Sequence, residues 1–574
     1  VLRKDLASPV APESDEEKVV EKGTDQANSD KDKDNDKGKD KDKDKKPPTV
    51  EIDLDNISQR IVALPIPARN YVGLHLGKNG LLYIVERAEP GSDAEPPSST
   101  TYKFDFKSRK LDKALDGLSY FDVSFNGEKI LYARGGQWWI SPADTLGGPP
   151  APGKGPLNLA ELRIWVDPRA EWKHMYYQVW RDERDFLYDP GLHGLDLATI
   201  KKKYEPYLDH LATRDDLNYL FVEMLGDITI GHMFVGGGDL PEHKHVSGGL
   251  LGADYTIENG RYRFAKIYNG ENWNPKLRAP LTQPGVNVSV GDYLLAVNGR
   301  NVETSIDVSS YFEETAGKQV IIRVGPNSDG SGARDVTVIP VDNETPLRNY
   351  AWIEGNRRKV DELTGGRVAY VYMPDTGYGG FDNFNRYYFA QVGKQAVILD
   401  ERYNGGGDIA DYVIDYLRRP LMAYWSLREG ADLTTPIEAI FGPKVMIINE
   451  MAGSGGDAMP WLFHRAGIGT LVGKRTWGGL VGHYTNPADL LDGGFTGTPN
   501  LAFYNPEGAW EIENHGVNPD VDVEYDPRMV RQGHDPQLEK AVEVIMDQLK
   551  KNPPPVAPHH PAYPDYQHSR PAAP

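Results

Sequence analysis

The sequence predicts a multidomain protein that runs from β-propeller strands through an α-helical domain and a small β domain to an α/β domain. Three observations predict this order. Short strands separated by turn residues fill residues 50–147, apolar residues then recur at helical spacing over 160–245, and strands alternate with helices across 350–550. A length of 574 residues also suits several domains of roughly 100–200 residues each.

The composition excludes several classes of function. The formal net charge of −20, with no basic patch to offset it, argues against a nucleic-acid partner. The chain has no cysteine, which excludes disulfides, thiolate catalysis and cysteine-ligated metal but leaves the compartment open. No apolar run approaches the roughly 18 residues of a membrane-spanning helix.

The two ends of the chain are predicted to be disordered. Residues 1–49 are highly charged and end in an alternation of lysine and aspartate, which is typical of a solvated linker or insertion. After an amphipathic helix predicted over 537–549, residues 551–574 form a proline-rich tail. The histidines of this tail are more often solvated than metal-bound, so we expect no metal and no cofactor. They are His559, His560 and His568.

Residues 50–147 are predicted to form the last blades of a β-propeller. Their short strands, the first at 60–65, are separated by Gly, Asn, Ser or Pro, and about four strands in roughly 45 residues suit a propeller blade. Only about two blades fit into this stretch, too few to close a ring. Val1 is not an initiating Met, and no apolar segment of a signal peptide follows it. We therefore expect a fragment that lacks most of its propeller.

Residues 160–245 are predicted to be helical and to carry a histidine near their end. Aromatic residues recur at helical spacing from Trp172 to Phe186, which indicates a packed core. The run Thr213-Arg-Asp-Asp216 resembles a capping box that starts a further helix. Beyond it, residues 226–235 are predicted to form a short apolar strand with His232. A single histidine in such a strand is more often structural than catalytic.

Residues 246–345 are predicted to form a small β domain. The run Val290-Gly-Asp-Tyr-Leu-Leu-Ala-Val-Asn-Gly299 strongly resembles the signature of PDZ domains, in which a strand and a helix flank a groove that accepts a peptide as an added strand. We expect the helix of this PDZ-like domain near 305–315. Peptide is therefore a candidate ligand, and a domain that only braces its neighbours is an equal alternative.

The α/β domain over 350–550 has glycine turns where its strands end. An apolar strand at 444–449 leads into the turn Gly453–Gly456, and helical spacing follows. Ser454 would then sit at a helix N-terminus, where unpaired N–H groups and the helix dipole favour an oxyanion. A second turn, Asn404–Asp408, falls at the same edge of a parallel sheet. On its own, the serine turn is more often a plain turn than a nucleophile.

The order of motifs along the chain is specific. The motifs are Trp165-Val-Asp-Pro-Arg-Ala-Glu-Trp172, Arg184-Asp-Phe-Leu-Tyr-Asp-Pro-Gly-Leu-His-Gly194, His232, the PDZ-like run, Asn404-Gly-Gly-Gly407, Gly453-Ser-Gly-Gly-Asp457 and Glu513-Asn-His-Gly-Val-Asn-Pro-Asp520. In this order they resemble tricorn protease and its bacterial homologues over nearly all of residues 50–550. The resemblance implies a serine peptidase of the tail-specific protease superfamily with a catalytic core like those of crotonase and ClpP.

The resemblance also implies a role for each site residue. Ser454 would be the nucleophile, His232 its general base and Glu513 the acidic member of the relay. The oxyanion hole would consist of the backbone N–H of Gly455 and one from the second glycine turn, taken as Gly406. These residue types suit the chemistry, because a serine hydroxyl is a poor nucleophile until a positioned imidazole takes its proton, and a carboxylate orients that imidazole.

The expected partners and compartment follow from the same resemblance. It implies peptide substrates and a homo-oligomer, which is a hexamer in the family, with no nucleic acid and no membrane span. It also implies a cytoplasmic location. A periplasmic location stays open because the chain is expected to be a fragment.

One position departs from the family pattern. Tricorn carries a serine directly before the histidine, where it links the histidine to the glutamate, and here that position is Gly231. Glu513 would therefore reach His232 directly, through water or by way of Thr229. Relatives with a Ser-Lys dyad carry the lysine after a Thr-Phe-Gly sequence, where this chain has Gly479, so a Ser-His mechanism is preferred.

Two other functions remain as alternatives. A catalytically silent scaffold would bind peptides through its propeller and PDZ-like domains. A tail-specific processing protease would discriminate between free and amidated C-termini, whereas a tricorn-like enzyme would cut small substrates at internal sites. The sequence does not fix the residue preferred at the cleavage site.

Overall fold

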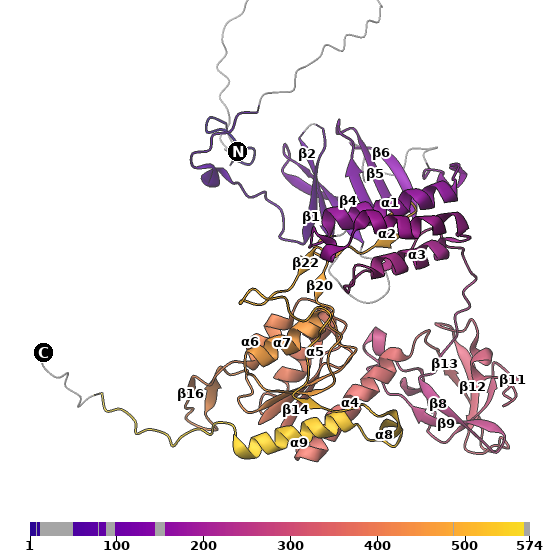
Figure 1. The fold of residues 1–574 in the computed structure, drawn as a ribbon, viewed down its shortest axis with the longest axis vertical. Helices are drawn as coiled ribbons and strands as arrows, with labels where there is room; N and C mark the ends of the chain where they lie inside the picture. The colour runs from indigo at the N-terminus through magenta and orange to yellow at the C-terminus, as the bar shows by residue number, and fades with distance from the viewer. Residues whose placement is uncertain are drawn as a thin grey trace, which may run out of the picture. The chain divides into compact units, whose positions relative to one another are not determined.

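The computed structural model describes residues 1–6, 8–11, 50–78, 80–87, 98–143, 155–485 and 487–566 (Figure 1). These residues fall into two compact units, Val1–Ile164 and Trp165–Pro574. Most of the charged stretch before residue 50, and the end of the tail with His568, lie outside the described residues. Within the described ranges, no helix is long and apolar enough to cross a membrane.

The first unit is an antiparallel sheet in which each strand pairs with the next along the chain. The strands are β1 (Tyr71–Leu76), β2 (Leu81–Arg87), β3 (Ser99–Asp105), β4 (Lys110–Val123), β5 (Lys129–Arg134) and β6 (Gln137–Pro142), with short 3-10 helices η1 (Ile57–Arg60) and η2 (Leu159–Glu161) outside them. Neighbouring residues of β2 pack into two clusters, one with Tyr83 and one with Ile84, because side chains alternate across a strand. This meander confirms the predicted partial propeller, although residues 60–65 form no strand.

The second unit begins with the predicted helical domain. Its helices are α1 (Pro168–Phe186), η3 (Leu192–Gly194), α2 (Leu197–Tyr204), η4 (Glu205–His210) and α3 (Arg214–Gly226). The side chain of Thr213 accepts from the N–H of Asp216 and the Asp216 carboxylate accepts from the N–H of Thr213, which is the predicted capping box. The aromatic residues of α1 from Trp172 to Trp180 pack in the core, where Tyr176 and Trp180 are fully buried, whereas Phe186 is exposed.

The segment after α3 differs from the expected strand. Only β7 (Val235–Gly236) is a strand, and it pairs with β21 (Phe495–Thr496) of the α/β domain. His232 lies in the loop before it, with φ of 61°. The two domains are also joined by a buried ion pair in which Arg214 Nε lies 2.5 Å from an Asp492 carboxylate oxygen. These contacts hold the histidine loop against the α/β domain.

The PDZ-like domain is a sheet with the strand order β13-β12-β10-β9-β8, and β11 pairs with β10. Its elements are β8 (Ala253–Glu258), β9 (Arg261–Ile267), η5 (Pro275–Leu277), η6 (Pro280–Thr282), β10 (Tyr293–Val297), β11 (Arg300–Asn301), η7 (Val308–Phe312), β12 (Val320–Gly325) and β13 (Arg334–Val338). The helix expected near 305–315 is present only as the short 3-10 helix η7. It ends at Phe312, before Glu313 and Glu314. The signature run supplies β10, which is buried along its whole length.

The α/β domain is built on five parallel strands in the order β14-β15-β18-β19-β23. The strands are β14 (Val368–Tyr372), β15 (Ala396–Asp400), β18 (Lys444–Ile448), β19 (Thr470–Gly473) and β23 (Val521–Asp522). The helices are α4 (Thr345–Thr364), α5 (Tyr378–Phe389), α6 (Ala410–Leu417), α7 (Gly455–Arg465), α8 (Pro527–Arg531) and α9 (Pro536–Lys551). Short strands pair outside the main sheet: β16 (Ala423–Trp425) with β17 (Leu433–Thr435), and β20 (Val481–Gly482) with β22 (Leu501–Ala502).

Helices cover both faces of this parallel sheet (Figure 1). One face packs against α5, α6 and α7, and the other packs against α4 and α9. Strands β14, β15 and β18 are therefore buried at every position, which explains their nearly continuous apolar sequences. The loops at the carboxyl ends of β15 and β18 are the two glycine turns, as predicted for the edge at which sites form.

Candidate active site

Ser454 occupies the sharp turn between β18 and α7. Its backbone has φ of 58° and ψ of −117°, a conformation that a non-glycine residue adopts only at a cost. The flanking glycines make the turn possible, because a Cβ on Gly453 would lie 2.6 Å from the ring of Trp477 and one on Gly455 would lie 1.9 Å from Thr376 Oγ1. The glycines therefore allow neighbouring loops to close on the serine from both sides.

Asp457 holds this strained turn in place. Its carboxylate accepts hydrogen bonds from the N–H of Ser454 at 3.0 Å, from the N–H groups of Gly478 and Gly479 at 2.8 and 3.0 Å, and from Thr476 Oγ1 at 2.5 Å. The side chain is fully buried, and this burial raises its pKa against the effect of the four hydrogen bonds. Asp457 thus ties the serine turn to the 476–479 loop.

His232 lies directly beside the serine. Its Nε2 is 3.1 Å from Ser454 Oγ, although 222 positions separate the two residues in the chain. Burial lowers the pKa of His232, the neighbouring His483 lowers it further, and Glu513 opposes both. His483 also bonds through Nε2 to the backbone carbonyl of His232 at 2.9 Å. The lowered pKa favours the neutral imidazole, which is the form that accepts a proton.

Glu513 reaches the histidine loop through the backbone. One carboxylate oxygen accepts from the N–H of Gly231 at 2.7 Å, and the other accepts from the N–H groups of Leu480 and Val481 at 2.6 and 3.0 Å. Nδ1 of His232 is buried and has no hydrogen-bond partner in the described part of the protein. Of the routes left open by the sequence, neither the direct bond nor the one by way of Thr229 is present.

The two glycine turns meet at Ser454. A Cβ on Gly406 would lie 2.7 Å from Ser454 Cβ, so only glycine allows this approach. The N–H of Gly406 donates to Asn404 Oδ1 at 3.0 Å. Among the described residues, the N–H groups of Gly455 and Gly407 donate to no acceptor. The edge of the sheet therefore presents unengaged backbone donors beside the serine hydroxyl.

Several groups around the site gave no signal in the sequence. His483 and the buried Glu401 belong to no sequence pattern that predicts a role. Asn404 and Asp457 lie in the two glycine motifs, but their hydrogen bonds are not predicted by those motifs. Across the described ranges, no cluster of three or more His, Cys, Asp or Glu side chains could hold a metal ion.

A cavity of about 510 Å³ lies beside Glu513. The Arg184–Gly194 motif forms one of its walls with Tyr188, Asp189, Pro190 and His193. The N–H of Tyr188 donates to the carbonyl of Pro499 at 2.9 Å, which ties the motif to the α/β domain. This motif therefore helps to seat the helical domain, with its histidine, on the domain that carries the serine.

Comparison with known proteins gives three successive family matches. The tricorn protease C1 domain matches residues 168–226, the tricorn protease PDZ domain matches 249–343, and peptidase family S41 matches 367–523. The three matches follow the order of the helical, PDZ-like and α/β domains.

Individual relatives agree with these matches. Tricorn protease homolog 1 of Streptomyces coelicolor is 33% identical over 522 residues, which are 88% of this chain and 48% of that protein. Tricorn protease of Thermoplasma volcanium is 30% identical over 517 residues, with 88% of this chain and 49% of that protein covered. The crystal structure of the tricorn protease superposes with a TM-score of 0.80 at 26% identity, over 88% of this chain and 49% of that one.

The chain spans about half the length of these relatives. A more distant relative, carboxyl-terminal-processing peptidase 3 of Arabidopsis thaliana, is 32% identical over 139 residues, or 22% of this chain. By its domains and its relatives, the chain therefore belongs with the tricorn proteases and their homologues, within peptidase family S41.

Proposed function

We propose that this chain is a serine peptidase that degrades oligopeptides or unfolded segments through an acyl-enzyme formed on Ser454. The observation that carries the proposal is the 3.1 Å contact between His232 Nε2 and Ser454 Oγ at the N-terminus of α7. A candidate nucleophile, a candidate base and backbone N–H groups without an acceptor thus lie close together at the edge of a domain that matches family S41.

The proposed reaction has two halves. Ser454 Oγ attacks the carbonyl carbon of the scissile peptide bond while His232 Nε2 takes the hydroxyl proton. The negative charge on the carbonyl oxygen is stabilised by the N–H of Gly455 and by one from the 405–407 loop. His232 then gives its proton to the leaving amine, and a water molecule activated by the same imidazole hydrolyses the ester.

The second oxyanion donor is a choice between two amides of that loop. The N–H of Gly406 is the donor expected from the sequence, and it serves only after it leaves Asn404 Oδ1. The N–H of Gly407 needs no such release. Each good donor of this kind contributes roughly 3 kcal/mol to lowering the barrier.

Glu513 acts on the base without a hydroxyl relay in this proposal. Its carboxylate fixes the Gly231 peptide, which fixes the position of His232. Its negative charge also favours the imidazolium that forms when the proton is transferred, in line with its effect on the pKa of His232. Glu513 is therefore a positioning and electrostatic residue, and Gly231 is the link.

The finer properties of the enzyme are part of the proposal. Internal cleavage of short peptides, peptide substrates, assembly into a homo-oligomer and a cytoplasmic location come from the family resemblance. The processing-protease alternative has a specific observation in its favour, since a carboxyl-terminal-processing peptidase is among the relatives. Peptides blocked at both ends separate the two, because a processing protease requires a free C-terminus and an endopeptidase does not.

The test of the nucleophile is intact-mass labelling with a fluorophosphonate. Wild type is expected to gain one adduct, and Ser454→Ala and His232→Ala are expected to gain none. The control is Ser289→Ala, a serine of the PDZ-like domain, which is expected to label as wild type does. A folded wild type that takes no label would contradict the catalytic proposal and favour the silent scaffold.

A further inference from the structure

The open edge of the PDZ-like sheet lies along strand β13. This strand ends the sheet, because its one neighbour in the sheet order is β12. Beyond β13 the chain continues to Val341, whose N–H and C=O both bond to Leu250 at 2.9 and 2.7 Å. After Leu250 the chain turns away from this edge at Gly252, which has φ of 68°, and continues into β8. The edge before Val341 is therefore left without a covering strand.

The backbone of Ile339 is free to pair on this edge. In an extended strand, N–H and C=O groups point to alternate sides, so Ile339 faces the same way as Val341. The carbonyl of Pro340, one position along, accepts instead from the N–H of Gly317 on the opposite side. Within the described ranges, neither the N–H nor the C=O of Ile339 forms a hydrogen bond. The residue as a whole is 53% exposed.

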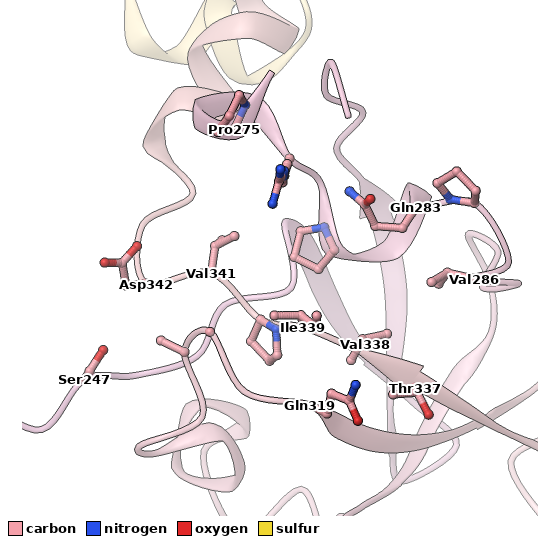
Figure 2. Close-up of a pocket in the computed structure, with 16 residues that line it drawn as sticks. Ser247, Pro275, Gln283, Val286, Gln319, Thr337, Val338, Ile339, Val341 and Asp342 are labelled. Atoms are coloured by element: carbon pink, nitrogen blue, oxygen red, sulfur yellow. The ribbon is translucent and has the colours of Figure 1, made fainter. Parts of the chain in front are cut away.

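A cavity of about 700 Å³ adjoins this edge and extends past Pro340 to Ala316, Gly317 and Gln319 on the β12 side. Figure 2 shows Thr337, Val338, Ile339 and Val341 along one side of it, with Gln283 across from them. The lining is mainly apolar and includes four prolines, which present surface but no N–H groups: Pro275, Pro280, Pro284 and Pro340. This volume falls in the range of pockets that bind ligands, roughly 300–1,000 Å³.

Two opposite charges complete the lining. Arg278 and Asp342 are its charged residues, both are exposed, and in the part of the chain that the structure describes neither forms an ion pair. The net charge of the lining is therefore zero. A ligand recognised here needs extended backbone and apolar side chains more than it needs charge.

The groove that the PDZ resemblance pointed to lies elsewhere and is partly occupied. It is a smaller cavity of about 330 Å³ between residues 249–255 and η7. There the N–H of Gly252 donates to Glu344 Oε2 at 2.9 Å, and the other oxygen of Glu344 accepts from Arg348. The chain's own carboxylate thus holds a backbone donor of that groove.

We propose that the β13 edge is a peptide-binding site, at which an extended, mainly apolar segment of a polypeptide substrate adds as a strand beside Thr337–Ile339. Strand addition matches the unpaired N–H and C=O of Ile339, and the proline-rich wall accommodates the side chains on one face of the bound segment. The site lies outside the Ser454 centre. It therefore does not depend on which residues carry out the chemistry.

The test measures binding without turnover. Ser454→Ala protein is titrated into a fluorescein-labelled peptide of alternating valine and threonine, and fluorescence anisotropy reports the Kd. Ile339→Pro removes the free N–H and fits the extended backbone before Pro340, so it is expected to weaken binding at least about tenfold. The matched control is Ile321→Ala, since Ile321 is 51% exposed on β12 and outside the cavity.

A second variant and a labelling experiment complete the test. If Ile339→Pro does not fold by circular dichroism, Ile339→Asp, which places a charge on the same edge, is expected to weaken binding equally. A photo-reactive version of the peptide is expected to label residues 275–286 or 337–342. Unchanged binding in both Ile339 variants, labelling at 249–255 or 308–312, no binding at all, or a dimer by sedimentation that excludes the peptide would each overturn the proposal.

Discussion

Replacing Glu513 by glutamine removes one negative charge and one acceptor from the site while keeping the size of the side chain. The wild-type carboxylate accepts from Gly231 on one oxygen and from Leu480 and Val481 on the other. A glutamine has a single acceptor oxygen, so its NH₂ group must face one of these two sets of N–H donors. The glutamine oxygen is expected to face the two N–H groups of Leu480 and Val481, which bind it better than one. The glutamine NH₂ group then faces the N–H of Gly231, so two donors oppose each other and that hydrogen bond is lost.

The size of the effect follows from that lost bond. A hydrogen bond to a charged group contributes about 1.5–3 kcal/mol, and each 1.36 kcal/mol is about tenfold in rate. Glu513→Gln is therefore expected to lower kcat/KM, or the rate of fluorophosphonate labelling, by roughly 10- to 150-fold.

The pH dependence supplies a second readout. Glu513 raises the pKa of His232, against burial and His483, which lower it. Removing the charge lowers the pKa further, and because the neutral imidazole is the base, the acid limb of the rate profile moves to lower pH. The assay is the labelling rate of both proteins between about pH 5 and 8, where imidazoles titrate.

Glu511→Gln is the matched control for this substitution. Glu511→Gln alters a nearby carboxylate that accepts from Trp461 Nε1 and Asn505 Nδ2, both at 2.7 Å, and it is expected to label within about twofold of wild type. A Glu513→Gln protein that labels as fast as wild type, or whose acid limb moves to higher pH, would refute a role of Glu513 through Gly231.

Three further predictions concern single positions. Gly231→Ser adds a Cβ 3.5 Å from the Glu513 carboxylate and 3.3 Å from Trp477, so we expect folded protein that labels within about threefold of wild type; a loss of folding by circular dichroism would contradict this. Asp457→Asn replaces an acceptor oxygen with a donor at the serine turn, and steady-state kinetics on a peptide substrate are expected to show kcat lowered roughly 10- to 150-fold at unchanged KM. Burial raises the pKa of Glu183 from 4.5 to about 8, so the unfolded chain gives up this proton first and stability falls as pH rises between those values. Glu183→Gln is expected to lose less of its Tm than wild type over that window, and equal losses in differential scanning fluorimetry would argue against a buried neutral carboxyl.

The layers of the molecule follow closely from local sequence pattern. Strands β14, β15 and β18 are short apolar runs bounded by turn residues, and a sheet covered on both faces has to use such runs. The Thr213–Asp216 capping box is equally local, because both of its bonds join residues three positions apart. Elements of this kind depend on their own few residues, so a sequence is enough to predict them.

The inner details of the site depend on contacts that span the chain. The bond between Gly231 and Glu513 joins residues 282 positions apart, and no spacing rule predicts that a peptide N–H would take the place of a side-chain hydroxyl. The hydrogen bond from Gly406 to Asn404 depends on a side-chain rotamer, which sequence pattern does not specify. The expected strand with His232 became a loop because its strand pairing with β21 covers only Val235–Gly236.

The separation of His232 from Ser454 in the chain has a consequence during synthesis. Domains fold largely as units in the order in which they leave the ribosome, so the helical domain with the base is complete well before the serine has been translated. Glu513 arrives later still, and until then nothing fixes the Gly231 peptide. On an emerging chain the proposed set of Ser454, His232 and Glu513 is therefore incomplete until the α/β domain has been translated and has packed against the helical domain.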